Sequence, residues 1–160
     1  MITRRMMVTW LGGALAAIEV GLPSAKAGPA RFATTLSDAE WRKRLSPAQY
    51  AVLRESATEE PYTSPLLKEH RRGDFLCAGC SQPLYSSTTK FESGTGWPSF
   101  WMPLPHAIGT ATDRSLGMIR TAVYCSGCGG HLGHVFDDGP PPTGMRYCMN
   151  GLALQFRPAV

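Results

Sequence analysis

The spacing of apolar and polar positions changes near residue 73 and divides the chain into a helical part and a strand-rich part. Beyond this point the apolar runs are short or alternate with polar residues, and Gly and Pro separate them, as is typical of antiparallel strands and hairpins. The pattern predicts strands at residues 74–76, 84–86, 119–124, 134–136, 146–149 and 153–157. We therefore expect a mainly β fold.

Two short helices are predicted before these strands. Ser37 is followed three residues later by Glu40, which is the pattern of a capping box, and Pro47 ends the first helix. A second helix fits residues 46 to about 54, with the proline at its first position. The prolines in residues 60–65 exclude regular structure there, so we expect this segment to wrap over the body as an extended arm.

The first residues have the pattern of an export signal. Arg4 and Arg5 precede an apolar run over residues 6–18, and Ala25-Lys26-Ala27 is a small-x-small site of the kind that signal peptidase cleaves. The alternative is a transmembrane anchor, but the run has about 13 residues where a bilayer span needs roughly 20, and Glu19 interrupts it. We expect export and no stable membrane span.

The arginine pair, followed by a weakly apolar run rich in Gly and Ala, resembles a twin-arginine signal, which exports folded proteins. A bacterial periplasm is therefore the expected location. On this interpretation residues 1–27 form the signal peptide, residues 28–36 a linker and residues 37–158 the domain.

Composition narrows the class of protein. The chain has 160 residues, of which 43% are apolar and 18% charged, as expected for one globular domain with an appendage. Its 17 Gly and 13 Pro are too many for a helix bundle. The net charge of +4 comes from scattered basic residues, so no nucleic-acid partner is indicated. Five Cys leave at least one thiol unpaired within the chain.

Two Cys-x-x-Cys pairs, Cys77/Cys80 and Cys125/Cys128, are suited to hold one structural zinc ion per chain. In each pair a Gly precedes the second Cys, where we expect a tight turn that needs positive φ. The long separation of the pairs means that the metal would join two distant hairpins. The alternatives are two disulfides in an exported protein and a nucleic-acid-binding zinc ribbon, which lacks a basic and aromatic face here.

The remaining cysteine has polar neighbours. A strand over residues 146–149 has a period of two that places Arg146, Cys148 and Asn150 on one face. A guanidinium beside a thiol lowers its pKa, and Asn150 could hydrogen-bond a substrate or help to place the sulfur. The alternative for a lone Cys in a strand is an apolar filler of the core.

His131 and His134 precede a β-rich segment. They lack the intervening glutamate of a helical zinc protease, so we interpret them as general acids near the lone thiol or, alternatively, as core residues bonded to the backbone. Trp97 and Phe100 follow a Gly-x-Gly turn, and an aromatic wall is a good receptor for a methyl group on sulfur. The alternative for Trp97 is a core residue under a loop.

Together, the paired cysteines, residues 96–100, residues 131–136 and residues 146–150 resemble the methionine-R-sulfoxide reductase family, MsrB. The resemblance covers roughly residues 37–158. It implies two antiparallel sheets with short N-terminal helices, clipped by a zinc remote from the reaction. It also implies reduction of the R epimer of methionine sulfoxide in oxidised proteins or peptides, which is protein repair under oxidative stress.

The resemblance also assigns roles to individual residues. Cys148 matches the nucleophile, Trp97 the methyl-binding indole, and Asp138 an acidic residue that orients the site. The family's polar residues around the substrate are matched by His131, His134, Arg146 and Asn150.

Two departures from the family pattern stand out. Where many members have a recycling Cys, this chain has Thr95, so the usual internal disulfide cannot form and a thioredoxin-like protein or a small thiol must regenerate the enzyme. Residues 150–154 read Asn-Gly-Leu-Ala-Leu rather than the more common Asn-Ser-x-Ser-Leu, which we expect to tune packing and not to remove activity.

The residues themselves fit this chemistry, because a sulfoxide needs a thiolate, an acid and a methyl pocket for reduction. Attack by Cys148 would leave a sulfenic acid. Two other classes stay open: a zinc-stabilised binding module with a structural Cys148, and a thiol peroxidase. Methionine formation from a racemic sulfoxide peptide separates all three.

Overall fold

The computed structural model describes residues 32–160, and both predicted helices are confirmed there as α1, Asp38–Arg44, and α2, Pro47–Glu55. Each begins with a capping box, formed by Ser37 with Glu40 and by Ser46 with Gln49. The predicted signal peptide and residues 28–31 of the predicted linker lie outside the described residues. Within 32–160, no helix has the length and apolar character needed to cross a membrane.

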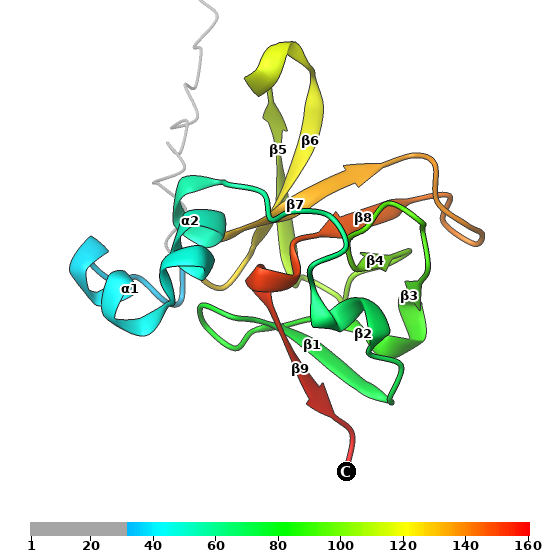
Figure 1. The fold of residues 1–160 in the computed structure, drawn as a ribbon, viewed down its shortest axis with the longest axis horizontal. Coiled ribbons are helices and arrows are strands. Elements are labelled where there is room, and N and C mark those ends of the chain that lie inside the picture. Colours follow the sequence, from blue (N-terminus) through cyan, green and yellow to red (C-terminus); the bar gives the residue numbers. More distant parts are fainter. Residues whose placement is uncertain (1–31) are drawn as a thin grey trace, which may run out of the picture. The chain divides into compact units, whose positions relative to one another are not determined.

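The body consists of two antiparallel sheets, which confirms the predicted fold class (Figure 1). Three strands in the order β2-β1-β9 form the smaller sheet: β1 Gly73–Cys77, β2 Pro83–Ser86 and β9 Leu154–Pro158. Six strands in the order β3-β4-β8-β7-β6-β5 form the larger: β3 Lys90–Phe91, β4 Ser99–Phe100, β5 Ile108–Asp113, β6 Arg120–Cys125, β7 His131–Phe136 and β8 Arg146–Met149. Short 3-10 helices connect them: η1 Pro65–Lys68, η2 Ser87–Thr89, η3 Ser115–Gly117 and η4 Gly151–Ala153.

All six predicted strands are present, with ends that differ by up to three residues, and β3, β4 and β5 are additional. β5 escaped prediction because its residues, Ile-Gly-Thr-Ala-Thr-Asp, are mostly exposed and lack a run of apolar side chains. It is nevertheless an edge strand that pairs with β6 along its full length. β7 begins at His131 and not at His134, because the strand continues through Gly133.

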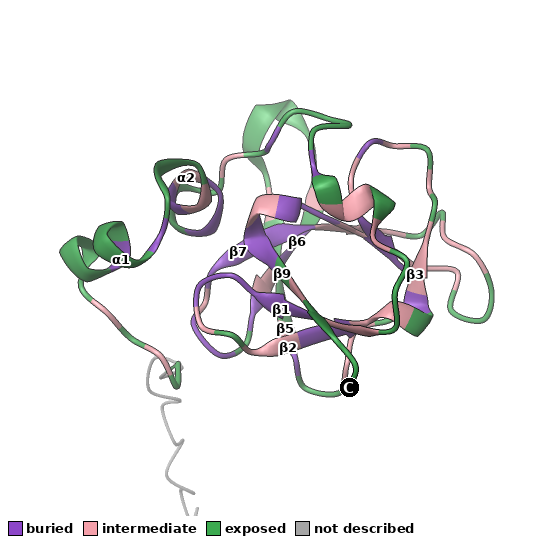
Figure 2. Cartoon of the chain, turned by 60° about the horizontal axis from the view of Figure 1, so that its bottom comes forward, coloured by how far each residue is buried: buried purple, intermediate pink, exposed green. Residues whose placement is uncertain are grey.

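Aromatic side chains fill the space between the sheets. Phe100 stacks on Tyr85, with ring centroids 4.4 Å apart, and meets the edge of Phe75 at 4.9 Å. Trp41 of α1 and Leu53 of α2 belong to the same buried cluster, so the helices are part of the core. Figure 2 shows that α1 is otherwise largely exposed, whereas much of the buried surface lies on the strands.

The predicted arm lies between α2 and η1, although Pro61 and Tyr62 form a turn within it and Pro65 already begins η1. The backbone N–H of Tyr62 donates to the carbonyl of Gly96 at 2.7 Å, and its hydroxyl donates to the carbonyl of Gly94 at 2.6 Å. The indole N–H of Trp97 donates to the carbonyl of Glu59 at 3.1 Å. The arm therefore lies along the loop that carries Trp97 and fixes the position of its side chain.

Candidate active site and metal centre

The two Cys-x-x-Cys pairs meet at one point. Their four sulfur atoms lie within 4.8 Å of one another, and the Sγ atoms are 3.7 Å apart for Cys77 and Cys128 and 3.5 Å apart for Cys80 and Cys125. Four thiolates at about 2.3 Å from a tetrahedral zinc ion would stand about 3.8 Å from one another. The donor set and its dimensions thus fit a structural zinc ion, and all four cysteines are free thiols rather than disulfides.

The two pairs form turns of the same construction. In the first, the N–H of Ser81 donates to the carbonyl of Cys77 at 2.8 Å. In the second, the N–H of Gly129 donates to the carbonyl of Cys125 at the same distance. The positive φ angles lie at Ser81 and Gly129, after the second Cys, so the expectation of positive φ at Gly79 and Gly127 is wrong. At Gly127 the reason for glycine is space, because a Cβ there would lie 3.2 Å from the Cys80 sulfur.

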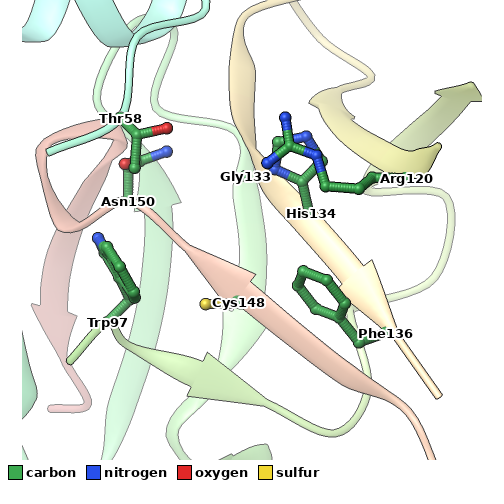
Figure 3. Close-up of a pocket in the computed structure, with 8 residues that line it drawn as sticks. All are labelled: Thr58, Trp97, Arg120, Gly133, His134, Phe136, Cys148 and Asn150. Atoms are coloured by element: carbon green, nitrogen blue, oxygen red, sulfur yellow. The ribbon is translucent and has the colours of Figure 1, made fainter. Parts of the chain in front are cut away.

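The fifth cysteine, Cys148, lines a hollow of about 110 Å³. In the view of Figure 3, Trp97 and Phe136 lie on opposite sides of the Cys148 sulfur. The complete lining consists of Thr58, Trp97, Arg120, Gly133, His134, Phe136, Cys148 and Asn150. A small hollow with aromatic walls and a few polar groups suits a ligand that has one apolar and one polar end.

Strand pairing places the reactive side chains. His134 of β7 lies opposite Cys148 of β8, which in turn lies opposite Ser99 of β4. Side chains of directly opposed residues point to the same face of an antiparallel sheet, so the imidazole and the thiol share one face. Gly133 permits this close pairing, because a Cβ there would lie 2.1 Å from the carbonyl oxygen of Cys148.

The sulfur of Cys148 is under opposing influences. Burial raises the pKa of the Cys148 thiol, while the hydroxyl of Thr95 and the charge of Arg146 lower it. The expectation that Arg146 would leave the thiol with a lowered pKa is therefore wrong for the free protein, because desolvation of the thiolate is the largest effect.

Three hydroxyl groups form a chain that ends at this sulfur. The hydroxyl of Ser99 donates to the carbonyl of Trp97 at 3.1 Å, and its oxygen lies 2.7 Å from that of Ser93. Ser93 lies 2.8 Å from the Thr95 hydroxyl, which is 3.8 Å from the Cys148 sulfur. When Cys148 loses its proton, Thr95 is thus a hydroxyl donor within reach of the thiolate.

His134 belongs to a second polar cluster. Its Nε2 lies 2.8 Å from Oδ2 of Asp113, and the same oxygen accepts a hydrogen bond from Arg120 at 2.7 Å. The other carboxylate oxygen accepts from the backbone N–H of Ser115 at 2.8 Å. The pKa of Asp113 is held well below its usual range, most of all by the Ser115 hydroxyl, then by the Ser115 N–H and by His134.

His131 does not share the role expected of it. It is 3% exposed and lines an adjoining hollow of about 380 Å³, which shares His134 with the Cys148 hollow. Neither of its ring nitrogens has a hydrogen-bond partner among the described residues. Burial, with a smaller contribution from His134, lowers the pKa of His131 to about 4. A neutral imidazole at pH 7 is a poor proton donor, so a general acid is disfavoured. The alternative of a core residue bonded to the backbone holds for the burial of His131 but not for the bond, since no backbone group in the described part of the chain hydrogen-bonds its ring nitrogens.

Arg146 and Asp138 form a pair at the rim of the site. Nε and one terminal nitrogen of Arg146 each donate to a different oxygen of Asp138 at 2.8 Å. The guanidinium lies 4.4 Å from the centre of the Phe136 ring. Asp138 is exposed, and neither it nor Arg146 lines the hollow, although Arg146 is close enough to act on the pKa of the Cys148 thiol.

Asn150 lies just beyond β8, whose bounds agree with the predicted strand at residues 146–149. Its amide oxygen accepts from the N–H of Glu59 at 2.9 Å, and its amide nitrogen donates to the carbonyl of Leu132 at 3.2 Å. Asn150 thus lines the hollow while tying the arm to β7.

Phe100 was expected among the substrate-binding residues, and the structure corrects this. Its side chain is fully buried between Tyr85 and Phe75 and does not line the hollow. Alternation explains the difference, because Phe100 follows Ser99, whose side chain is on the Cys148 side of β4.

Gly151 and Ser64 fit together beside the site. A Cβ on Gly151 would lie 1.9 Å from the hydroxyl oxygen of Ser64. The same hydroxyl accepts a hydrogen bond from the N–H of Leu66 at the start of η1. The glycine in this chain's Asn-Gly-Leu-Ala-Leu segment is therefore matched to a serine on the arm.

Sequence reasoning missed several residues of this site. The signal for Asp113 and Arg120 lies in the pairing of β5 with β6, which a pattern of exposed residues did not reveal. The signal for Phe136 was its place two residues after His134 on the same strand, which puts both on one face. Thr58 and Glu59 belong to irregular backbone, which carries no periodic signal.

Comparison with known proteins agrees with this arrangement. The SelR domain matches residues 45–158. The peptide methionine sulfoxide reductase MsrB of Agrobacterium fabrum is 52% identical over 123 residues, which are 76% of this chain and 91% of that protein. The protein of the same name from Bradyrhizobium diazoefficiens is 50% identical over 138 residues, covering 86% of this chain and 99% of the relative. The chain therefore belongs to the MsrB family of SelR-domain proteins.

Proposed function

We propose that this protein reduces methionine-R-sulfoxide in oxidised proteins and peptides to methionine, with Cys148 as the nucleophile. The observation that carries the proposal is the position of Cys148 in a small hollow between Trp97 and Phe136, with His134 on the same face of the sheet. The relatives named above are peptide methionine sulfoxide reductases, and the chain aligns with nearly the whole of each.

The groups of the hollow match the parts of a sulfoxide. The aromatic rings of Trp97 and Phe136 offer an apolar surface to the methyl group on sulfur, which contacts aromatic rings favourably. His134 supplies a proton to the sulfoxide oxygen, and the Cys148 thiolate attacks the sulfur. In the net reaction the S–O bond of the sulfoxide breaks and an S–O bond forms on Cys148, which is oxidised by two electrons to a sulfenic acid while methionine is released.

Regeneration then requires a thiol from another molecule. Four of the five cysteines lie in the metal cluster, and Thr95 stands beside Cys148 where a recycling cysteine would be needed. A thioredoxin-like protein or a small thiol would attack the sulfenic acid, release water and leave a mixed disulfide for a second thiol to reduce. In the absence of reductant we expect about one methionine per enzyme, with the sulfenic acid on the Cys148 peptide.

The metal is proposed to be zinc, one ion per chain, held by Cys77, Cys80, Cys125 and Cys128. When bound, it would act as a structural clip, because four protein thiolates leave no coordination position for a substrate. Elemental analysis of the purified protein tests both the identity of the metal and its stoichiometry.

A peptide that contains a racemic methionine sulfoxide, incubated with the enzyme and dithiothreitol, tests the reaction. We expect methionine to form from the R epimer while the S epimer remains. Cys148→Ser is expected to abolish the reaction while retaining metal and fold, since Cys148 lies outside the metal cluster. An inert wild-type protein would support a binding module, and consumption of peroxide without reduction of sulfoxide would support a thiol peroxidase.

Export through the twin-arginine route is proposed for residues 1–27, on the strength of Arg4, Arg5 and the small-x-small site at 25–27. The mature protein from its native host is expected to begin at or near Gly28. Replacement of both arginines by lysine is expected to stop export by the twin-arginine route, whereas continued export would indicate the general secretory route. An intact Met1 on cytoplasmic protein would contradict export altogether.

A further inference from the structure

The hydrogen bond between Asp113 and His134 joins two parts of the chain that the sequence does not connect. Asp113 is the last residue of β5, and it pairs across the hairpin with Arg120 at the start of β6. His134 lies on the next strand, β7. The side chains of all three are largely buried, with 18%, 22% and 12% of their surfaces exposed for Asp113, Arg120 and His134.

This bond determines which nitrogen of His134 carries a proton. Asp113 is ionised, because its oxygens accept hydrogen bonds from Ser115, Arg120 and His134, and a carboxylate only accepts. Nε2 of His134 must therefore carry a hydrogen. Among the described residues, no hydrogen bond is made by Nδ1, and the imidazole lines the hollow that contains Cys148.

We propose that Asp113 is a positioning residue for His134: it fixes the ring orientation and keeps a hydrogen on Nε2, so that Nδ1 is the nitrogen that takes up a second proton and passes it to the sulfoxide oxygen. This inference rests on the proposed function. The logic is that of other histidine sites, in which a buried carboxylate orients the imidazole and stabilises its charged form. Asp113 touches neither the substrate nor the sulfur, so it acts only through His134.

Arg120 holds Asp113 in place for its hydrogen bond with His134. It shares Oδ2 of Asp113 with His134 and also donates to the hydroxyl of Ser115 at 3.2 Å. The carboxylate is thus held from the hairpin side and cannot swing away when the imidazole changes its charge. The turn at the end of β5, for which the sequence pattern made no prediction, thus carries the residue that positions His134.

Nitrogen NMR of the wild-type ring tests the assignment without any change to Asp113. Two-bond proton–nitrogen spectra distinguish the two neutral tautomers, and the signals of His134 are identified by their loss in His134→Gln. We expect the Nε2–H form. Observation of the Nδ1–H form as the main tautomer would overturn the proposal, whatever the enzyme does to sulfoxides.

Kinetics of Asp113→Asn then tests the role in turnover. An amide has a single acceptor oxygen and cannot serve Ser115, Arg120 and His134 together, so we expect mixed or altered tautomers. The reduction step should slow about 10- to 100-fold in kcat, with KM changed by less than about threefold. Unchanged kcat, or an unchanged His134 tautomer in a variant of low kcat, would contradict positioning.

Asp74→Asn is the matched control. Asp74 also pairs with an arginine, Arg157, at 3.1 Å, but this pair lies on the smaller sheet, away from Cys148. We expect normal kcat and an unchanged His134 spectrum for this variant. If wild type itself fails to reduce sulfoxide, the proposed function is wrong, and the tautomer measurement still decides the Asp113 assignment.

Discussion

Burial and hydrogen bonding have opposite effects on the pKa of the Cys148 thiol. Desolvation raises the pKa of this thiol, and the neighbouring hydroxyl of Thr95 and guanidinium of Arg146 act in the other direction. A thiol with a raised pKa resists unwanted oxidation while the hollow is empty, since the thiolate is the reactive form. Its reactivity then depends on the groups that donate hydrogen bonds to the sulfur.

Thr95→Val removes one of these donors with little change in shape. We expect the thiolate fraction of Cys148 to fall about fivefold at neutral pH, which corresponds to a hydrogen bond of about 1 kcal/mol. The rate of alkylation of Cys148 by iodoacetamide measures this fraction. Thr95→Ser should retain the wild-type rate, and Thr110→Val on the exposed strand β5 is the control. Equal rates for wild type and Thr95→Val would show that the hydroxyl does not stabilise the thiolate.

His131 makes stability depend on pH. Its pKa of about 4 in the folded protein lies below the ordinary 6.5, so the unfolded chain takes up the proton first as the pH falls. Stability should therefore decrease from about pH 6.5 down to about pH 4, by up to about 3 kcal/mol, and be unaffected by this group above that range.

Urea unfolding of wild type and His131→Phe across pH 4–7 measures this effect. The difference in unfolding free energy between the two should grow in favour of the variant as the pH falls. His70→Gln, at an exposed histidine, should follow wild type. The comparison separates His131 from any loss of metal at low pH, which affects all three proteins alike. A constant difference across the range would contradict the assignment.

Single residues were predicted unevenly. Cys148, Trp97 and His134 carry chemical types and spacings that point to a reaction, and the structure brings them to one hollow. Phe100 and His131 were assigned to the site through the motifs that contain them, yet Phe100 is buried in the core and His131 lines an adjoining hollow that it shares with His134. Distance along a strand does not show which face a side chain occupies when a bulge intervenes, as it does in the pairing of β6 with β7.

At the scale of elements, the arm between α2 and η1 holds the site together through one side chain. The carboxylate of Glu59 accepts from the N–H of Gly151 and, at 3.0 Å, from that of Leu152, at the start of η4. Its backbone bonds Trp97 and Asn150. The wall of the hollow therefore depends on an irregular segment to which these hydrogen bonds are important.

Glu59→Ala leaves the two N–H groups without an acceptor. We expect a loss of about 1–3 kcal/mol in the free energy of unfolding, because unsatisfied buried donors keep their desolvation cost. KM for the sulfoxide peptide should rise as Trp97 loses its support. Glu60→Ala, at the adjacent exposed position, is the matched control for both unfolding and kinetics. Wild-type stability in Glu59→Ala would show that the arm is held by other contacts.

Elements with apolar runs or caps were predicted well, and those without them were not. The two helices were predicted from their Ser-x-x-Glu and Ser-Pro patterns. Apolar or alternating residues predicted five of the strands, namely β1, β2, β6, β8 and β9. β3 and β4 have two residues each, and β5 lacks an apolar face. These strands form because a neighbouring strand provides hydrogen-bond partners for their backbone. Which strand is the neighbour depends on the tertiary structure and cannot be inferred from the local sequence.

For the whole molecule, the metal cluster joins the two sheets. Cys77 is the last residue of β1 in the smaller sheet, and Cys125 is the last of β6 in the larger. A structural zinc ion bound by these cysteines would contribute about 10–16 kcal/mol, which equals or exceeds the whole stability of an ordinary domain. The fold class and this clip were predictable from the sequence through the resemblance and the paired cysteines, whereas the order of the strands was not.

Replacement of Cys77 or Cys125 by Ser should therefore cause loss of metal together with cooperative unfolding. Circular dichroism and a colorimetric zinc assay on the same samples measure the two together. Cys148→Ser, with the same chemical change outside the cluster, should keep both metal and fold. An intact fold with full metal content in Cys77→Ser would show that the cluster is not the clip described here.

The contact of Gly151 with Ser64 makes the effect of one substitution depend on the residue already present at the other position. Restoring the family's more common serine at position 151 would force two side chains into the space of one, since its Cβ would stand 1.9 Å from the Ser64 oxygen. Gly151→Ser should therefore destabilise the chain less when Ser64 is replaced by glycine in the same variant, because the side chain that would be displaced is then absent.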